Sequence, residues 1–151
     1  MFEHISFTIP NKYGNFLYRI IENTQLANQF IVFNYSDIIN FDLNQNTNIM
    51  NDFPYTFDSV FKLLNLKHYI MFLKITFLDS NKCDFLEICS LDDFLYSGSS
   101  TMLFITDSKY VNIITKNNII TNQIEINVIK NNFENLNVSK NKLLCDIFDF
   151  I

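Results

Sequence analysis

Glycine is nearly absent from this sequence of 151 residues, which contains only Gly14 and Gly98. Loops that bind phosphate groups through their backbone amides need several glycines at close spacing. We therefore expect no nucleotide binding through such a loop. Gly98 lies in the run Ser-Gly-Ser-Ser, which is typical of a connector between two elements.

Histidine and cysteine are also scarce, with two and three residues respectively. A zinc site takes four closely placed Cys or His ligands, and here these side chains are scattered along the chain. No metal site and no cofactor are predicted. The odd number of cysteines, without a Cys-x-x-Cys pair, favours reduced and mostly buried thiols in a cytoplasm over disulfides. The residues concerned are His4, His68, Cys83, Cys89 and Cys145.

Basic residues are outnumbered by acidic ones, 11 to 16, which gives a formal net charge of −5, and Arg19 is the only arginine. Nucleic-acid binding needs a basic surface that neutralises phosphates, and no basic stripe is present. No apolar run reaches the ~20 residues needed to cross a bilayer, because Lys74 interrupts the longest one. The first residues lack the basic start and long apolar run of a signal peptide. These absences predict a cytoplasmic protein that binds neither nucleic acid nor membrane.

Apolar and aromatic side chains are abundant by contrast. The sequence is 48% hydrophobic and contains 17 Phe and 7 Tyr. A chain of this length can bury roughly 70% of its unfolded surface, so its core needs neither a disulfide nor a metal. No repeat or linker divides the sequence. We therefore predict a single globular domain over residues 1–151.

Two apolar segments are predicted to form the middle of a sheet. Thr101 to Thr115 consists of two apolar runs separated by Asp107 and Ser108, which indicates strand, turn and strand. Tyr69 to Leu78 has the same character and is expected beside it. The strand that begins at His68 is apolar on both faces, which is typical of a central strand. A further strand, Phe2 to Ile9, alternates between apolar and polar residues.

Three short helices are predicted from apolar spacing and capping residues. Thr56 is a suitable N-cap for one of them, and Ser90 with Asp93 has the spacing of a capping box. The three predicted helices begin at Asn15, Phe57 and Ser90 and end near Asn23, Asn65 and Tyr96.

Other segments are less regular. A hairpin is predicted from Phe30 to Tyr35 and from Asp37 to Asp42, with its turn at Ser36 and Asp37, and is followed by a polar loop, Asn44 to Asn51. In Asn117 to Asn131, apolar residues recur at helical spacing but also alternate, and β-branched residues favour strands. We predict a helix, because Asn132 suits its C-terminal end. A last strand near Leu136 to Ser139 and an extended tail, Leu143 to Phe150, complete the chain.

These elements predict an α+β fold: a mostly antiparallel sheet with three or four helices packed against it. The segment ISFTIPNKYGNFL, Ile5 to Leu17, resembles the opening of a family of small uncharacterised proteins from low-G+C spore-forming bacteria. The run Ile9 to Gly14 carries most of the likeness. The order continues with HYIMFLKITFL, a DDFLYS helix, and strands that end at Asp107 and Lys116. The resemblance implies a helix over Asn117 to Asn131 and brings no assigned function and no active site.

No catalytic residues are predicted. A Cys–His nucleophilic pair needs hydrogen-bond contact and a third, orienting group, and nothing in the spacing places a cysteine near His4 or His68. Both histidines are interpreted as surface or strand-end residues. The neighbouring carboxylates of Asp92 and Asp93 fall in the first turn of a helix, where negative charges interact favourably with the helix dipole.

The one loop that we consider for binding lies between the first strand and the first helix. Its candidate residues are Asn11, Lys12, Tyr13 and Asn15, because free amides before a helix can hold an anion and Tyr13 adds contact area. The alternative is an ordinary strand–helix turn in which Gly14 allows the backbone conformation that the turn needs.

Three functions are compatible with this sequence. The first is a non-catalytic, protein-binding domain of a regulatory or immunity type, and the second is a small-molecule-binding domain or an unrecognised enzyme, which requires a concave pocket with converging polar groups. The third is a homo-oligomer formed through the apolar tail, Leu143 to Ile151, which could pair on a sheet edge.

Overall fold

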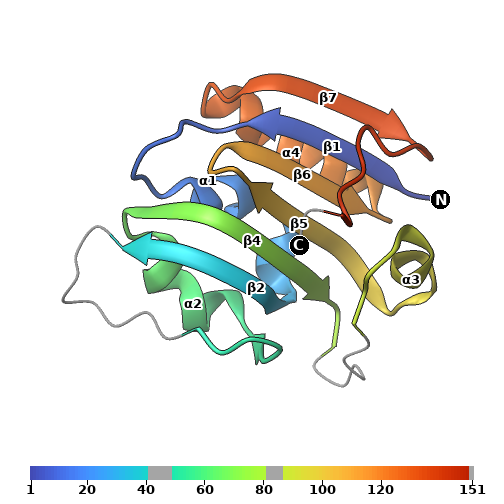
Figure 1. Ribbon diagram of the computed structural model, residues 1–151, viewed down its shortest axis with the longest axis horizontal. Coiled ribbons are helices and arrows are strands. Elements are labelled where there is room, and N and C mark those ends of the chain that lie inside the picture. Colours follow the sequence, from blue (N-terminus) through green and yellow to red (C-terminus); the bar gives the residue numbers. More distant parts are fainter. Residues whose placement is uncertain (41–48, 81–86, 150–151) are drawn as a thin grey trace.

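A computed structural model describes residues 1–40, 49–80 and 87–149, and these residues form an α+β fold (Figure 1). One seven-stranded sheet has the strand order β3-β2-β4-β5-β6-β1-β7, and every pair of neighbours is antiparallel. This confirms the predicted sheet and its helices. The strands are β1 (Glu3–Thr8), β2 (Phe30–Asn40), β3 (Pro54–Tyr55), β4 (His68–Leu78), β5 (Ser99–Thr106), β6 (Tyr110–Thr115) and β7 (Glu134–Lys140). The helices are α1 (Phe16–Ile21), α2 (Phe57–Leu64), α3 (Leu91–Tyr96), α4 (Asn118–Lys130) and a 3-10 turn, η1 (Gln25–Asn28).

The middle of the sheet is the pair of apolar segments that the sequence singled out. Leu73 of β4 lies opposite Ile105 of β5, and β5 continues into β6 through a three-residue turn, residues 107–109. In that turn Asp107 and Ser108 have positive φ angles of 54° and 63°. Two consecutive positive φ values suit a tight hairpin, because they match the twist of the flanking strands. The predicted strand, turn and strand are confirmed.

Capping chemistry explains where the helices begin. The side chains of Thr56, Ser90 and Asn117 accept hydrogen bonds from backbone N–H groups in the first turns of α2, α3 and α4. These bonds satisfy donors that have no partner within a helix. The segment with ambiguous spacing is therefore a helix, as predicted, and Asn132 follows its last turn with a φ of 54°.

The predicted hairpin at Ser36 and Asp37 is wrong. Residues Phe30–Asn40 form one strand, in which Ser36 pairs with Leu73 and Asp37 with Phe72 of β4. The long β4 strand offers a continuous ladder, and pairing with it outweighs the local turn preference of a Ser-Asp pair. Two irregularities in register, at Phe33/Tyr35 and Asp37/Ile38, accommodate the polar residues instead. Asp42 and most of the predicted polar loop lie outside the described residues.

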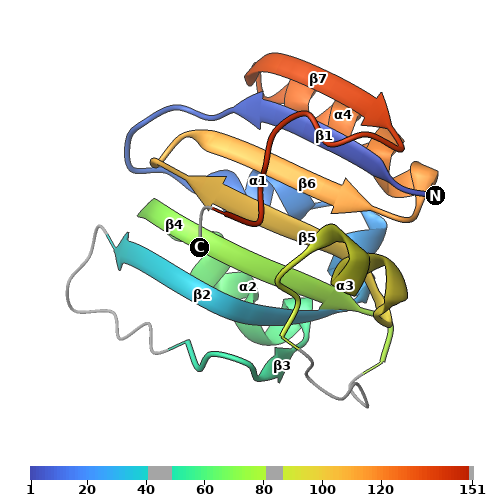
Figure 2. The same cartoon turned by 45° about the vertical axis from the view of Figure 1, so that its right-hand side comes forward.

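The two faces of the sheet carry different elements (Figures 1 and 2). Helices α1, α2 and α4 cover one face, while α3 and the C-terminal tail, residues 141–149, lie on the other, hereafter the tail face. The tail crosses β1 and β6 and forms no strand within its described residues. Its Ile147 is fully buried and packs in a cluster with Phe104 of β5 and Phe94 of α3. The sheet is thus buried on both faces along its middle.

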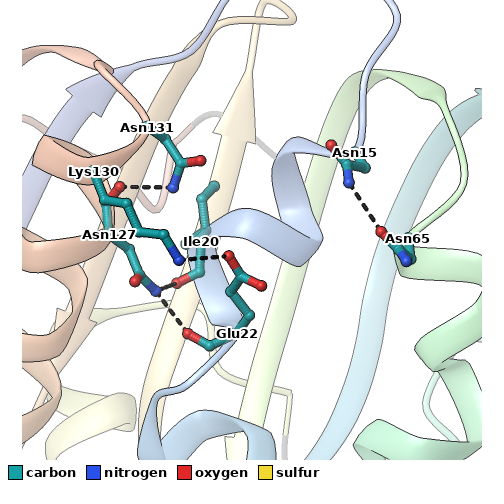
Figure 3. A network of polar contacts seen from close by, with 7 residues as sticks. All are labelled: Asn15, Ile20, Glu22, Asn65, Asn127, Lys130 and Asn131. Carbon is teal, nitrogen blue, oxygen red and sulfur yellow. Dashed lines mark hydrogen bonds and ion pairs between the residues drawn. The ribbon is translucent and has the colours of Figure 1, made fainter.

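Polar side chains fasten the helices to one another (Figure 3). Asn127 of α4 is buried and donates from Nδ2 to the carbonyl oxygens of Ile20 and Glu22, at 2.9 and 2.8 Å. Lys130 forms an ion pair with Glu22 at 3.5 Å. These contacts fix one flank of α4 against α1, and α1 in turn contacts α2. Helix α4 is therefore the outermost helix on the side of β7.

Candidate functional site: a pocket on the tail face

Strand alternation brings polar side chains together on the tail face. On β1, Ile5 and Phe7 enter the core under the helices, so that Ser6 and Thr8 point to the opposite face. Ser6 lies opposite Asn112 of β6, and Thr8 lies opposite Tyr110. Because residues that face each other across an antiparallel pair share a face of the sheet, hydroxyl, amide and phenol groups converge there.

These side chains form the floor of a pocket of about 690 Å³. Its size falls within the range of small-molecule sites in proteins, which is roughly 300–1,000 Å³. The described lining contains one charged side chain, that of Asp107, and no Lys or Arg. The polar lining residues are Ser6, Thr8, Thr106, Asp107, Tyr110, Asn112, Asn135 and Asn137, and the tail contributes Leu144 and Cys145.

The tail that walls this pocket is held by a chain of hydrogen bonds. The backbone N–H of Leu144 donates to Nδ1 of His4 at 2.8 Å. Since Nδ1 accepts, Nε2 carries the proton of the neutral ring, and it lies 3.0 Å from Oδ1 of Asn112. The Cys145 thiol donates to the same oxygen at 3.4 Å. Asn112 thereby connects β1, β6 and the tail.

The arrangement of Cys145, His4 and Asn112 differs from that of a nucleophilic Cys–His pair. Burial raises the pKa of the Cys145 thiol, and the carboxylate of Asp146 raises it further, whereas a nucleophilic cysteine needs a lowered pKa. Burial lowers the pKa of His4, and its hydrogen bond with Asn112 offsets part of that effect. Both ring nitrogens of His4 are engaged, and the Cys145 thiol donates its hydrogen bond to the amide oxygen of Asn112 and not to the ring.

The buried histidines predict that stability falls on mild acidification. The pKa values of His4 and His68 are both lowered from 6.5, mainly by burial. Below about pH 6.5 the unfolded chain therefore binds more protons than the folded one, and the free energy of unfolding decreases with falling pH by at most about 1.4 kcal/mol per pH unit for each histidine. Urea unfolding between pH 7.5 and 5 measures this slope. His4→Gln is expected to reduce it, and an unchanged slope in that variant would contradict the assignment to His4.

The interpretation of the histidines and cysteines requires three corrections. His4 and His68 are buried, with 0% and 3% exposure, and His68 does begin a strand but is no surface residue. Cys89 and Cys145 are exposed, contrary to the expectation of mostly buried thiols, and Cys83 lies outside the described residues. The spacing placed no cysteine near a histidine, yet Cys145 and His4 meet on one amide. The tail covers His4. The sequence did not predict this, because contacts between the two ends of a chain leave no local pattern.

The loop considered for binding is occupied by contacts within the chain. Asn11 accepts a hydrogen bond from the hydroxyl of Tyr69, and Asn15 donates to Asn65 at 2.9 Å (Figure 3). The ring of Tyr13 lies 5.7 Å from that of Tyr69. None of Asn11, Lys12, Tyr13 and Asn15 is among the described residues that line the pocket. Anion binding at this loop stays a prediction, and the observed contacts join the loop to β4 and α2.

Among the described residues, no group of three or more His, Cys, Asp or Glu side chains is arranged to hold a metal ion. The helices in the same part of the chain include none with the length and hydrophobicity needed to span a membrane.

The fold and the pocket define a class: α+β proteins with one antiparallel sheet, helices on one face, and a tail that walls a pocket on the other. The chain belongs to a family described as "Protein of unknown function (DUF2691)", whose model matches residues 3–144. It is similar to the "Uncharacterized protein YncE" of Bacillus subtilis (strain 168), with 27% identity over 143 residues, which cover 87% of this chain and 88% of that protein. No solved structure matches the chain. The resemblance seen in the sequence is thus confirmed.

Proposed function

We propose that this protein is a non-catalytic binding domain for a small, uncharged ring molecule that bears hydroxyl or amide groups. The pocket on the tail face supports this proposal, because it is concave and collects polar groups from β1, β5, β6, β7 and the tail. Among the functions expected from the sequence, small-molecule binding is the one that requires a concave pocket with converging polar groups.

The lining chemistry supports an uncharged ligand. Amide side chains such as those of Asn135 and Asn137 donate and accept hydrogen bonds equally, and hydroxyl groups do the same. An anionic ligand would meet the carboxylate of Asp107 and, among the described lining residues, no basic side chain. The net charge of −5 opposes anions further.

Aromatic surface within the pocket supports a ligand with a flat, apolar body. Phe72 and Tyr110 both line it, and Tyr110 is 44% exposed. A pocket with apolar walls and a few polar groups gains affinity from the walls and orientation from the polar groups. A ring with hydrogen-bonding substituents matches both parts.

A panel of nucleosides and cyclic polyols, with nucleoside 5′-monophosphates as matched charged controls, tests the proposal. Binding is measured by calorimetry and by shifts of the Asn side-chain amides in NMR spectra. We expect at least one uncharged probe to bind, and its phosphorylated counterpart to bind at least about tenfold more weakly. Ser6→Leu fills the pocket and is expected to abolish binding, whereas Ser6→Ala, the matched control, removes only a hydroxyl and keeps most of it. A silent panel, or binding that Ser6→Leu leaves unchanged, would overturn the proposal.

The expected protein-binding role and cytoplasmic location stay predictions. So does oligomerisation through the tail. The described tail residues support a different role for it, since Ile147 is buried and Leu144 is tied to His4 within the same chain.

A further inference from the structure

The C-terminal tail is anchored to the sheet at both of its ends. At its start, the N–H of Asn141 donates to the carbonyl oxygen of Phe2 at 2.8 Å, and its Oδ1 accepts from the N–H of Phe2 at 3.0 Å. The hydroxyl of Ser139 donates to the carbonyl oxygen of Lys142 beside this anchor. Towards its other end, the side chain of Ile147 is fully buried. The stretch between these anchors crosses β1 and β6 (Figure 2).

A histidine holds the middle of the tail, and its hydrogen-bonding role changes with protonation. The backbone N–H of Leu144 always donates, and it lies 2.8 Å from Nδ1 of His4. Nδ1 accepts this bond only while the ring is neutral, because both nitrogens of a protonated imidazole are donors. The other nitrogen, Nε2, is engaged with Asn112. A proton added to His4 therefore sets two donors against each other at Nδ1.

The ring cannot avoid this conflict while the tail covers it. His4 is 0% exposed, so no water reaches Nδ1 to take up the added proton. Turning the ring over places a carbon atom where Nδ1 now accepts, and the bond from Leu144 is lost in that case as well. A buried donor without an acceptor is costly. The protonated ring is therefore accommodated when the tail leaves and water reaches it.

The charged groups around His4 do not remove this conflict. Its neighbours on the tail face of the sheet are the uncharged Ser6, Ile114 and Ser139. The tail carries the titratable groups Lys142, Cys145, Asp146 and Asp149. Burial outweighs the effect of these groups, since the pKa of His4 is lowered. The Cys145 thiol stays protonated, because burial and the carboxylate of Asp146 raise its pKa. Histidine is also the side chain that ordinarily changes charge between pH 5 and 8.

We infer that the tail is an acid-sensitive wall of the pocket, in which protonation of His4 breaks its bond with Leu144 and releases the tail from the sheet. Above about pH 6.5 the tail is docked, and each pH unit below that value lowers the docking constant by at most about tenfold. Leu144 and Cys145 line the pocket, so release removes one wall and lowers the affinity for a ligand. That loss of affinity rests on the proposed function, whereas release of the tail does not.

Amide hydrogen exchange of the full chain at pH 7.5 and 5.5 tests the release without a ligand. Each rate is divided by that of an unstructured peptide at the same pH, which removes the pH dependence of exchange itself. We expect the protection of Leu144 to fall about threefold to tenfold at pH 5.5 and to stay below that of Leu103 in the middle of the sheet. Unchanged protection of Leu144, or protection equal to that of Leu103 at both pH values, would overturn the inference.

Replacing each buried histidine separates local release from general acid sensitivity. His4→Asn retains an acceptor on Cγ, where Nδ1 is bonded in histidine, and gains no proton in this range. We expect its Leu144 protection to be equal at both pH values. His68→Gln is the matched control, since the backbone of His68 pairs with Gly14 in the loop before α1, and it is expected to retain the wild-type fall. Equal falls in His4→Asn and wild type would contradict the role of His4.

NMR titration of the His4 ring nitrogens provides a test that needs no variant. At pH 7.5 we expect the tautomer with its proton on Nε2, because Nδ1 accepts from Leu144. On acidification, the midpoint of His4 protonation is expected to coincide with the loss of Leu144 protection. A proton on Nδ1 at pH 7.5 would overturn the inference, as would protonation of His4 that leaves the Leu144 amide protected.

Discussion

Replacing Phe104 by alanine is expected to lower the free energy of unfolding by about 3–5 kcal/mol and to release the C-terminal tail from the sheet. Phe104 is 1% exposed on the tail face of β5, and its ring meets that of Phe148 edge-on at 5.6 Å. It also belongs to the cluster that buries Ile147. Removing this ring leaves a cavity beneath the tail, and the tail loses its main apolar contact.

The neighbouring residue on the opposite face provides the control. Leu103 is fully buried under the helices, and Leu103→Ala is expected to cost a similar 2–5 kcal/mol or so without loosening the tail. Urea unfolding gives the free energies, and limited proteolysis under native conditions reports cleavage after residue 140. We expect faster tail cleavage in Phe104→Ala alone. Equal cleavage in both variants would contradict the role of Phe104 as the support of the tail.

Asn112→Ala is expected to cost about 1–3 kcal/mol, because it leaves the buried Nε2–H of His4 without an acceptor. Asn112 is 5% exposed, and its oxygen accepts from both His4 and Cys145. The cost is therefore larger than that of losing an exposed hydrogen bond. The variant is also expected to react faster with iodoacetamide at Cys145, since the thiol loses its partner on the sheet.

Asn15→Ala is the matched control, since it removes an amide whose bond to Asn65 is exposed to solvent. Its expected cost is below about 1 kcal/mol, with no change at Cys145. Alkylation followed by peptide mass analysis distinguishes Cys145 from the other thiols. If Asn112→Ala were as stable as wild type and Cys145 reacted at the same rate, the hydrogen-bonded chain from β1 to the tail would not contribute to the fold.

Much of the fold follows from local chemistry. The Asp107–Ser108 break separates β5 from β6, and the polar side chains of Thr56, Ser90 and Asn117 begin helices. In these cases the backbone groups at the end of an element find their hydrogen-bond partners within a few residues. The local sequence is therefore enough to predict where the element begins or ends. Helix α4 shows the limit of this rule, because its isoleucines fit either structure and the end at Asn132 decides between them.

The predictions that were wrong depend on distant neighbours. A Ser-Asp pair favours a turn in isolation, and only the long partner β4 draws residues Phe30–Asn40 into one strand. The pocket was missed for the same reason. His4 is 108 residues from Asn112, and Asn112 is 33 residues from Cys145. The sheet order places β1 beside β6 and so brings His4 and Asn112 together. The one local signal was Asn112 itself, a polar residue within the apolar strand YVNIIT.

The account depends on the tail lying against the tail face, because without it the pocket has no wall and His4 no cover. Amide hydrogen exchange of Leu144 measures this most directly, since its N–H donates to Nδ1 of His4. We predict that this amide exchanges at least about a hundredfold more slowly than in an unstructured peptide. Exchange of the Leu144 amide at the rate of a free peptide would show that the tail is not docked and would contradict the pocket built on it.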